Sequence, residues 1–285
     1  MTTLQPHQPV QRAAWSESAK APGRNSATRR RAISPAVQVN AVRLAVIVLF
    51  FGLWQASASN NWVSHLLAPP PWDVVMSLKR GLIDGLWWGD IGITVLETVL
   101  GFGIGFTVAV LVGTVFAFVP LLRRALYPFV IAFQCFPKVA VAPVLIVVLG
   151  YGIGPKVATA ALLAFFPILV ATIAGLTEIN PDEHNLMRAI RASWVYELRY
   201  LRIPNAMSYV FPAMDVAIVF ALLAAIVAEF LGANQGLGYI VQHRAAYGDT
   251  ATIYGALVVM AVIGLLFKGV LTLLKHYLPR SIVPR

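Results

Sequence analysis

The sequence predicts an all-α integral membrane protein with about six transmembrane helices. Hydrophobic residues make up 59% of the chain and charged residues only 12%, which is about half the charged share of a soluble domain. So many apolar side chains cannot all be buried inside a globule of 285 residues, and some must face lipid. Six apolar stretches also reach the length of about 20 residues that a helix needs to cross a bilayer.

The six predicted spans are separated by segments that are richer in polar residues, glycine or proline. They are approximately Val42–Ser59, Ile91–Val119, Tyr127–Leu149, Pro155–Leu176, Ala206–Phe230 and Ala251–Leu274. Strands of a membrane barrel would be shorter, with a polar residue at every second position. In the second span, Gly101 and Gly105 form a small-xxx-small pair that predicts close helix packing. The pattern therefore indicates a helical bundle.

The chain divides into a core and flanking segments. Residues 1–40 are rich in Ser, Ala, Pro, Gln and Arg, a composition that cannot bury enough surface to offset its ordering entropy, so they predict a disordered basic tail. Residues 41–90 hold the first span and a connector, residues 91–276 the transmembrane core, and residues 277–285 a second tail. In the connector, the pair Trp87-Trp88 is expected at the headgroup boundary.

The distribution of cations orients the bundle. If the N-terminus is cytoplasmic, the inner segments hold 17 of the 22 Lys and Arg residues. Because cations are disfavoured in translocated loops, this asymmetry places both termini inside. We therefore expect a multi-pass protein of the bacterial cytoplasmic (inner) membrane. The same distribution argues against nucleic acid as a partner, because the basic residues lie beside apolar spans rather than along one helix face.

One inner segment, residues 180–204, contains helix signals rather than loop signals. Asn180 can cap a helix, Pro181 suits its first position and Glu183 completes a variant of the capping box. Ser193 can cap a second short helix, and Pro204 ends that helix just before the fifth span. We therefore expect a pair of short helices on the cytoplasmic side.

The first of these short helices has an apolar strip made of Leu186, Met187 and Ile190, with Arg188 and Arg191 on other faces. An apolar strip on the cytoplasmic side would be exposed to water unless it packs against another surface. A partner protein would supply one, and so would the lipid headgroups if the helix pair lay in the membrane interface. The residues alone fit both interpretations.

Three ordered motifs resemble the permeases of binding-protein-dependent ABC importers. Residues 185–204 resemble their cytoplasmic signature loop, Glu-Ala-Ala, three residues, Gly, and a hydrophobic-Pro pair thirteen residues after the Gly. Here Arg191 occupies the Gly position, Asn185, Leu186 and Met187 occupy the Glu-Ala-Ala positions, and Ile203-Pro204 matches the pair. Residues 136–154 and 228–240 resemble the nitrate/sulfonate/taurine-type branch.

The resemblance implies a type I, MetI-like permease architecture and a non-catalytic transport subunit without a cofactor or metal. It implies as partners two ATP-binding-cassette ATPase subunits, an extracytoplasmic solute-binding protein and a second permease in a homodimer. It also assigns contact with the ATPase to residues of the signature loop. These are Asp182, Glu183, Leu186, Met187, Arg188, Ile190, Arg191, Ala192, Ser193 and Pro204.

Four ionisable residues are expected at bilayer depth, away from the ends of the predicted spans: Glu97, Lys138, Asp215 and Glu229. Each costs roughly 2.5–3.5 kcal/mol to insert, so such groups usually face a partner or a cavity. We expect Gln134, Lys138, Asp215 and Glu229 to line the translocation pathway. The alternative for Lys138 is a structural ion pair with Glu229 or Glu97.

The chain has no motor of its own. Residues 152–156 (Gly-Ile-Gly-Pro-Lys) lack the P-loop spacing and read as a turn with a basic residue. Two other functions are alternatives to an ABC importer permease. One is a stand-alone secondary transporter, which would predict inverted repeats, and the other is a membrane-embedded enzyme. The resembled branch carries small anions such as nitrate, sulfonates and taurine, and relatives import vitamin precursors or aromatic acids. The solute itself cannot be predicted.

Overall fold

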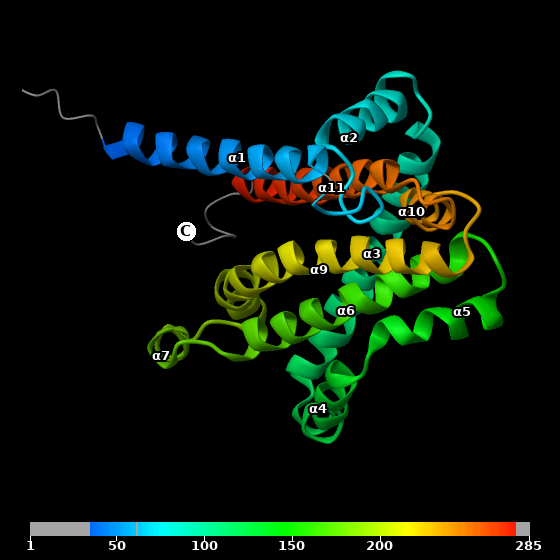
Figure 1. Cartoon of the computed structure of the whole chain (residues 1–285). Coiled ribbons are helices and arrows are strands. Elements are labelled where there is room, and N and C mark those ends of the chain that lie inside the picture. The colour runs from blue at the N-terminus through cyan, green and yellow to red at the C-terminus, as the bar shows by residue number, and fades with distance from the viewer. Residues whose placement is uncertain (1–34, 61, 278–285) are drawn as a thin grey trace, which may run out of the picture. The chain divides into compact units, whose positions relative to one another are not determined.

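The computed structural model describes residues 35–60 and 62–277, and every regular element in these ranges is a helix (Figure 1). The described chain forms two parts, one ending at Phe50 and one beginning at Phe51, with the boundary inside α1 (Pro35–Ser59). The other helices belong to the second part. They are α2 (Pro71–Leu78), α3 (Trp88–Phe118), α4 (Pro120–Cys135), α5 (Ala142–Leu149), α6 (Ile153–Thr177), α7 (Pro181–Ala189), α8 (Trp194–Glu197), α9 (Ile203–Gly232), α10 (Leu237–Ala246) and α11 (Thr250–Tyr277).

The helical membrane fold predicted from the sequence is confirmed. Five helices are long and apolar enough to cross a membrane: α1, α3, α6, α11 and the continuous helix Trp194–Gly232, which contains α9. α4 and α5 together would supply a sixth crossing. Of the predicted tails, residues 1–34 and 278–285 lie outside the described residues, whereas α1 already begins at Pro35.

The predicted third span, Tyr127–Leu149, is not one straight helix. α4 ends at Cys135, and the pair formed by α4 and the segment Lys138–Leu149 is bent by 87°. Pro137 explains the break, because it has no backbone N–H to donate and it disfavours a helical conformation in the residue before it. Phe136 is accordingly extended, with ψ of 137°.

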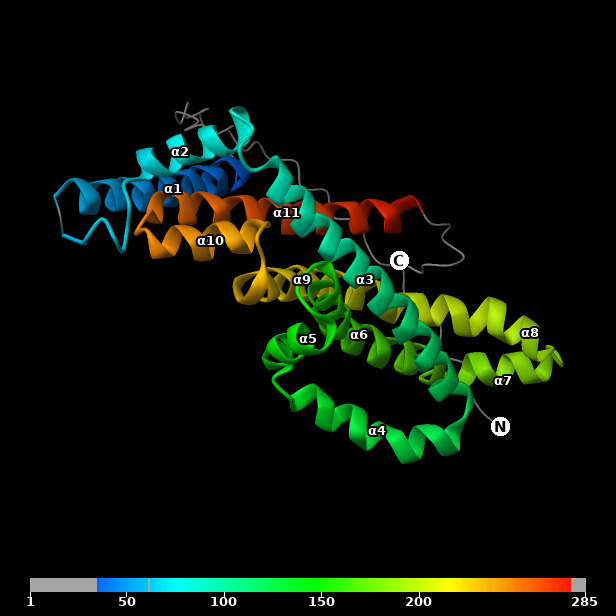
Figure 2. The same cartoon turned by 90° about the vertical axis from the view of Figure 1, so that its right-hand side faces the viewer.

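The centre of the second part is a three-helix layer of α3, α6 and α9 (Figure 2). Gly101 and Gly105 of α3 lie against α6, and a Cβ atom on Gly105 would come within 2.6 Å of the Ala161 carbonyl oxygen. A Cβ on Gly101 would overlap the Ala160 side chain. The predicted packing role of this glycine pair is therefore confirmed.

The three central helices define two ends of the bundle. The beginnings of α3 and α6 and the end of α9 meet beside α10, where Thr94, Glu97, Lys156 and Glu229 are in contact. The opposite ends of these helices meet beside α7 (Figure 2). We refer to them as the α10 end and the α7 end.

The tryptophan pair 87–88 is divided between the core and the surface. Trp87 is only 5% exposed and packs in a core cluster with Leu237 of α10 and Ala256 of α11. Its ring occupies the space beside Gly81, where a side chain would collide with it. Trp88 is exposed and donates its indole N–H to the Leu82 carbonyl oxygen at 2.9 Å. Burial of Trp87 depends on the space beside Gly81 and on packing against α10 and α11, which are distant in the sequence.

Candidate functional site

The segment 180–204 contains the two short helices that the sequence predicts. The Asn180 side chain accepts a hydrogen bond from the Asp182 amide at 3.0 Å, and Ser193 Oγ accepts one from the Tyr196 amide at 3.3 Å. Both predicted caps are confirmed. Among the described contacts, Glu183 makes no reciprocal hydrogen bond to Asn180, so the predicted capping-box variant is incomplete.

Arg191 has a left-handed backbone conformation, with φ of 53°. The amide of Arg191 donates to the Arg188 carbonyl oxygen, and the amide of Ala192 donates to the Met187 carbonyl oxygen at 2.9 Å. This arrangement closes the C-terminus of α7 in the way that usually places glycine in the left-handed position. It explains why the signature loop has Gly here, and it shows that Arg191 preserves the turn despite the substitution.

The apolar strip of α7 is open to its surroundings. Leu186 is 59% and Ile190 57% exposed, and Met187 is partly buried. Pro181, Asp182 and Glu183 at the start of the helix are exposed as well. Within the described residues, nothing covers this face, which is the condition for a docking surface.

A polar contact centred on Glu197 links α7 to the long helix that follows. The Glu197 carboxylate accepts hydrogen bonds from the Arg202 guanidinium at 2.6 and 2.9 Å, and His184 Nδ1 of α7 lies 3.3 Å from the same oxygen. Since Arg202 directly precedes α9, the three residues connect both short helices to the start of a membrane span.

Residues 194–205 also contact the C-terminal ends of α3 and α6. Arg202 also donates to the Leu176 carbonyl oxygen at 3.0 Å, and Asn205 donates to the carbonyl oxygens of Gly175 and Glu178. The Trp194 ring contacts Phe118 at the end of α3 edge to face, with centroids 5.6 Å apart. These contacts join residues 194–205, which follow α7, to the ends of α3 and α6.

A second feature is a cavity of about 510 Å³ between α4, α6 and α9, which Gln134 and Lys138 line. Lys138 Nζ donates to the Gln134 carbonyl oxygen at 2.9 Å and lies 4.9 Å from the centre of the Phe166 ring. The bend after Pro137 places Lys138 here, on the one-turn segment between α4 and α5. Two of the four predicted pathway residues thus line the same cavity.

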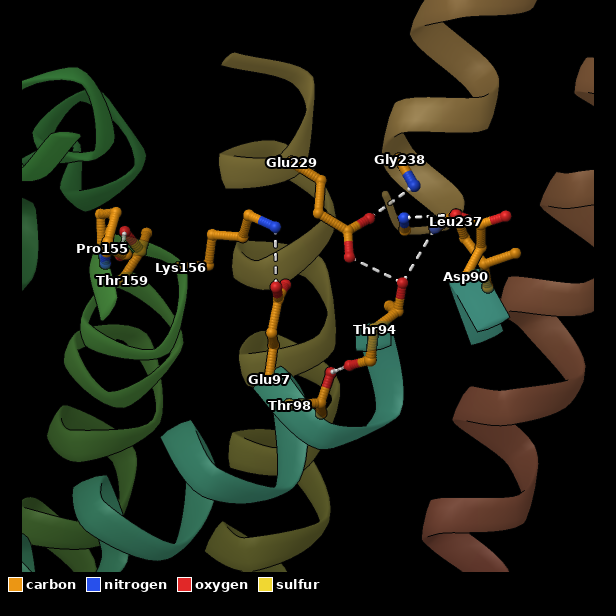
Figure 3. Close-up of polar contacts among 11 residues, drawn as sticks. Asp90, Thr94, Glu97, Thr98, Pro155, Lys156, Thr159, Glu229, Leu237 and Gly238 are labelled. Atoms are coloured by element: carbon orange, nitrogen blue, oxygen red, sulfur yellow. Dashed lines mark hydrogen bonds and ion pairs between the residues drawn. The ribbon is translucent and has the colours of Figure 1, made fainter. Parts of the chain in front are cut away.

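Lys138 forms no ion pair with any residue in the described ranges. The alternative partner Glu97 instead binds Lys156, whose Nζ lies 2.8 Å from Glu97 Oε1 (Figure 3). Lys156 is 6% exposed and Glu97 is fully buried. The sequence interpretation of residues 152–156 as a turn with a basic residue is therefore wrong for Lys156, which lies in the first turn of α6.

Glu229 belongs to a buried cluster at the α10 end (Figure 3). It accepts a hydrogen bond from the Thr94 hydroxyl at 2.7 Å and from the Gly238 amide at 2.6 Å. Thr94 in turn accepts one from the Leu237 amide, and Asp90 accepts one from the Gly236 amide. These contacts satisfy free amides at the start of α10, as a helix N-terminus requires.

The other two predicted pathway residues, Asp215 and Glu229, do not lie at the cavity of Gln134 and Lys138. Glu229 lines none of the described cavities, and Asp215, which is partly buried in α9, lines none either. Lys156 and Glu97 line a different cavity of about 410 Å³ at the α10 end. A charge at the start of a predicted span was the available signal for Lys156.

Residues 81–284 match the protein family described as "Binding-protein-dependent transport system inner membrane component". The chain belongs to this family. The riboflavin transport system permease protein RibX of Chloroflexus aurantiacus is 30% identical, over 82% of this chain and 87% of its own length. The aliphatic sulfonates transport permease protein SsuC of Bacillus subtilis is 24% identical, over 82% and 85%.

The fold is similar to that of solved permeases. A chain of the MetNI methionine ABC transporter, in an inward-facing conformation, matches with a TM-score of 0.55 at 20% identity, covering 64% of this chain and 91% of that chain. The permease architecture expected from the signature loop is confirmed. The chain is thus a multi-pass inner-membrane permease subunit of an ABC importer.

As a permease, the chain is a non-catalytic transport subunit that works with an ATPase and a solute-binding protein. ATP is hydrolysed by the partner ATPase. The alternative of a stand-alone secondary transporter is not favoured by this membership.

Proposed function

We propose that this permease forms a homodimer that carries a small anionic solute inward, driven by two ATPase subunits docked on residues 180–204. The observation that carries the proposal is the open apolar strip of α7, held by Glu197 and Arg202 to the start of α9. A soluble motor can transmit force only through such an ordered element. Asp182, Arg188, Arg191, Ala192 and Ser193 surround the strip, and Pro204 begins the span behind it.

The α7 end is the cytoplasmic end in this proposal, and both termini are inside. The clustering of cations supports it, because Arg123, Arg124, Arg188, Arg199 and Arg202 all belong to this end of the chain's helices. The α10 end then faces the extracytoplasmic binding protein.

The proposed pathway runs past Gln134 and Lys138. An ammonium group that has no carboxylate partner in the described chain favours an anionic solute. Candidates are sulfonates, taurine or nitrate, and also vitamin precursors or aromatic acids. The names of two relatives support this choice of solutes, because SsuC is named as a permease for aliphatic sulfonates and RibX as a permease for riboflavin.

The broken helix pair supplies the proposed dimer face. α4 has no buried residue, and large apolar side chains of α4 and α5 are exposed, among them Phe129, Phe133, Val147 and Val148. Since the cavity of Lys138 lies along this face, a second copy would enclose it between two permeases.

The docking role can be tested by co-purification. We expect Met187→Asp and Arg191→Glu to abolish association with the partner ATPase, while membrane insertion is unchanged. Lys275→Glu makes the same charge change as Arg191→Glu near the end of α11, outside residues 180–204, and serves as the control. Undiminished co-purification of the ATPase with both variants would refute the role of this segment.

Transport itself needs the complete assembly. Proteoliposomes that contain the permease, its ATPase and its binding protein should accumulate the solute only with ATP. Lys138→Gln should reduce the uptake of an anionic solute, whereas Lys275→Gln, near the end of α11, should not. Uptake by the permease alone would contradict the proposal.

A further inference from the structure

Two cavities lie one after the other along a single face of α6. The first is the cavity of about 510 Å³ with Lys138, where α6 contributes Leu163, Phe166, Pro167 and Val170. The second measures about 340 Å³ and lies at the α7 end, where α6 contributes Ile173, Ala174 and Thr177. Steps of three and four residues return to the same side of a helix. The stripe from Leu163 to Thr177 is therefore one continuous face.

α4 forms the opposite wall of both cavities. Its end contributes Gln134 to the first cavity, and its beginning contributes Arg123, Arg124, Tyr127 and Pro128 to the second. Arg124 and Gln134 are ten residues apart in α4, so at about 1.5 Å per residue the two cavities meet this helix at points about 15 Å apart. The groove between α4 and α6 thus has Lys138 beside the C-terminal end of α4 and two arginines at its α7 end.

The charge of the second cavity favours an anion. Neither Arg123 nor Arg124 forms an ion pair within residues 35–60 and 62–277. Glu178 also lines the cavity, and the Tyr209 hydroxyl donates to its Oε2 at 3.5 Å. Because two arginines and one glutamate line this cavity, the net charge of its lining is positive. Both arginines lie near the N-terminus of α4, where the helix dipole adds partial positive charge.

We propose that Arg123 and Arg124 form a second oxyanion site, at which the anionic group of the solute binds after leaving Lys138 and before release at the α7 end. The inference rests on the proposed function for the direction of travel. Arg guanidinium groups suit it because their planar donors bind carboxylate or sulfonate oxygens in pairs. Tyr127 lines the same cavity and adds a hydroxyl group.

A membrane phospholipid could offer the same oxyanion chemistry from its headgroup phosphate, so the test separates the two sources. The full-length permease is reconstituted in nanodiscs of phosphatidylcholine and treated with phenylglyoxal, which modifies accessible arginines. Adducts at each arginine are quantified by peptide mass spectrometry. Ethanesulfonate or benzoate is added in one arm, against chloride at equal ionic strength, and phosphatidylglycerol replaces part of the lipid in another.

We expect either organic anion to reduce adducts at Arg123 and Arg124 several-fold, with Arg188 and Arg199 unchanged as internal controls. These two controls belong to the same end of the chain but line neither cavity. Equal labelling with and without the organic anions would overturn the proposal, as would protection that extends equally to the controls. Protection by phosphatidylglycerol alone would also overturn it, by assigning the site to lipid.

The result is separable from the test of transport. If the complete assembly imports a solute with ATP while the two arginines stay unprotected, the second site is wrong and the transport function stands. If the arginines are protected while the assembly imports no anion, the site binds oxyanions but the proposed solute class is wrong.

Discussion

Lys156 Nζ lies 2.8 Å from Glu97 Oε1 in the interior of the bundle, and it joins the start of α6 to α3 (Figure 3). The second oxygen, Glu97 Oε2, is buried and has no hydrogen-bond partner in the described chain. A charge pair in such surroundings stabilises only while both partners are present, because removal of one leaves the other uncompensated.

We therefore expect Lys156→Met to lower the stability of the permease by about 3–5 kcal/mol. The double variant Glu97→Gln/Lys156→Met should recover much of that loss, because no unpaired charge remains. Thermal unfolding in detergent micelles measures both. Equal melting temperatures for the single and double variants would show that the pair makes no electrostatic contribution.

The α3–α6 contact yields a matched pair of glycine substitutions. Gly101→Ala would force a methyl group against Ala160, whereas Gly103→Ala adds one where no atom lies within 4 Å. Overpacking typically costs about 1–3 kcal/mol, so only Gly101→Ala should lower the melting temperature markedly. A comparable loss in Gly103→Ala would mean that close packing against α6 does not explain the effect, because helix propensity favours Ala over Gly.

The left-handed conformation of Arg191 at the end of α7 predicts that substitution by glycine increases the stability of this turn. Side chains in this conformation cost roughly 1–2 kcal/mol, so Arg191→Gly should stabilise the turn and slow hydrogen exchange at the Ala192 amide, which donates to Met187. Arg191→Val should accelerate that exchange. The opposite order would exclude the left-handed conformation in solution.

Glu229 is expected to hold α10 in place. Glu229→Ala removes the acceptor of the Gly238 amide and leaves Thr94 without its carboxylate partner. Each buried group left unsatisfied costs about 1–3 kcal/mol, so amides of residues 237–240 should exchange faster. Glu178→Ala, at the other end of the bundle, should leave this exchange unchanged. Unaltered protection of α10 in Glu229→Ala would rule out the capping role.

The contact between Glu197 and Arg202 is expected to matter for coupling rather than for docking. Arg202→Ala would free Glu197 and the Leu176 carbonyl oxygen. The ATPase should still co-purify, but ATP-driven uptake by the assembly should fall strongly. Arg199→Ala serves as the control. The Arg199 guanidinium lies over the Tyr200 ring and forms no ion pair within the described residues. Normal uptake in Arg202→Ala would show that force takes another route.

Local signals in the sequence were sufficient for the helices and for part of the site. The apolar spans and the caps at Asn180 and Ser193 depend on residues close together in the chain. So does the location of Lys138 beside Gln134, four residues earlier.

Only the tertiary structure decided which distant groups meet. Lys156 pairs with Glu97 across 59 positions, and Thr94 reaches Glu229 across 135. The sequence shows buried charges but not their partners, because partners depend on how α3, α6 and α9 rotate against one another. Likewise, the α4–α6 groove brings Lys138 and two arginines beside α6, and the sequence did not show that the predicted third span is broken by an 87° bend.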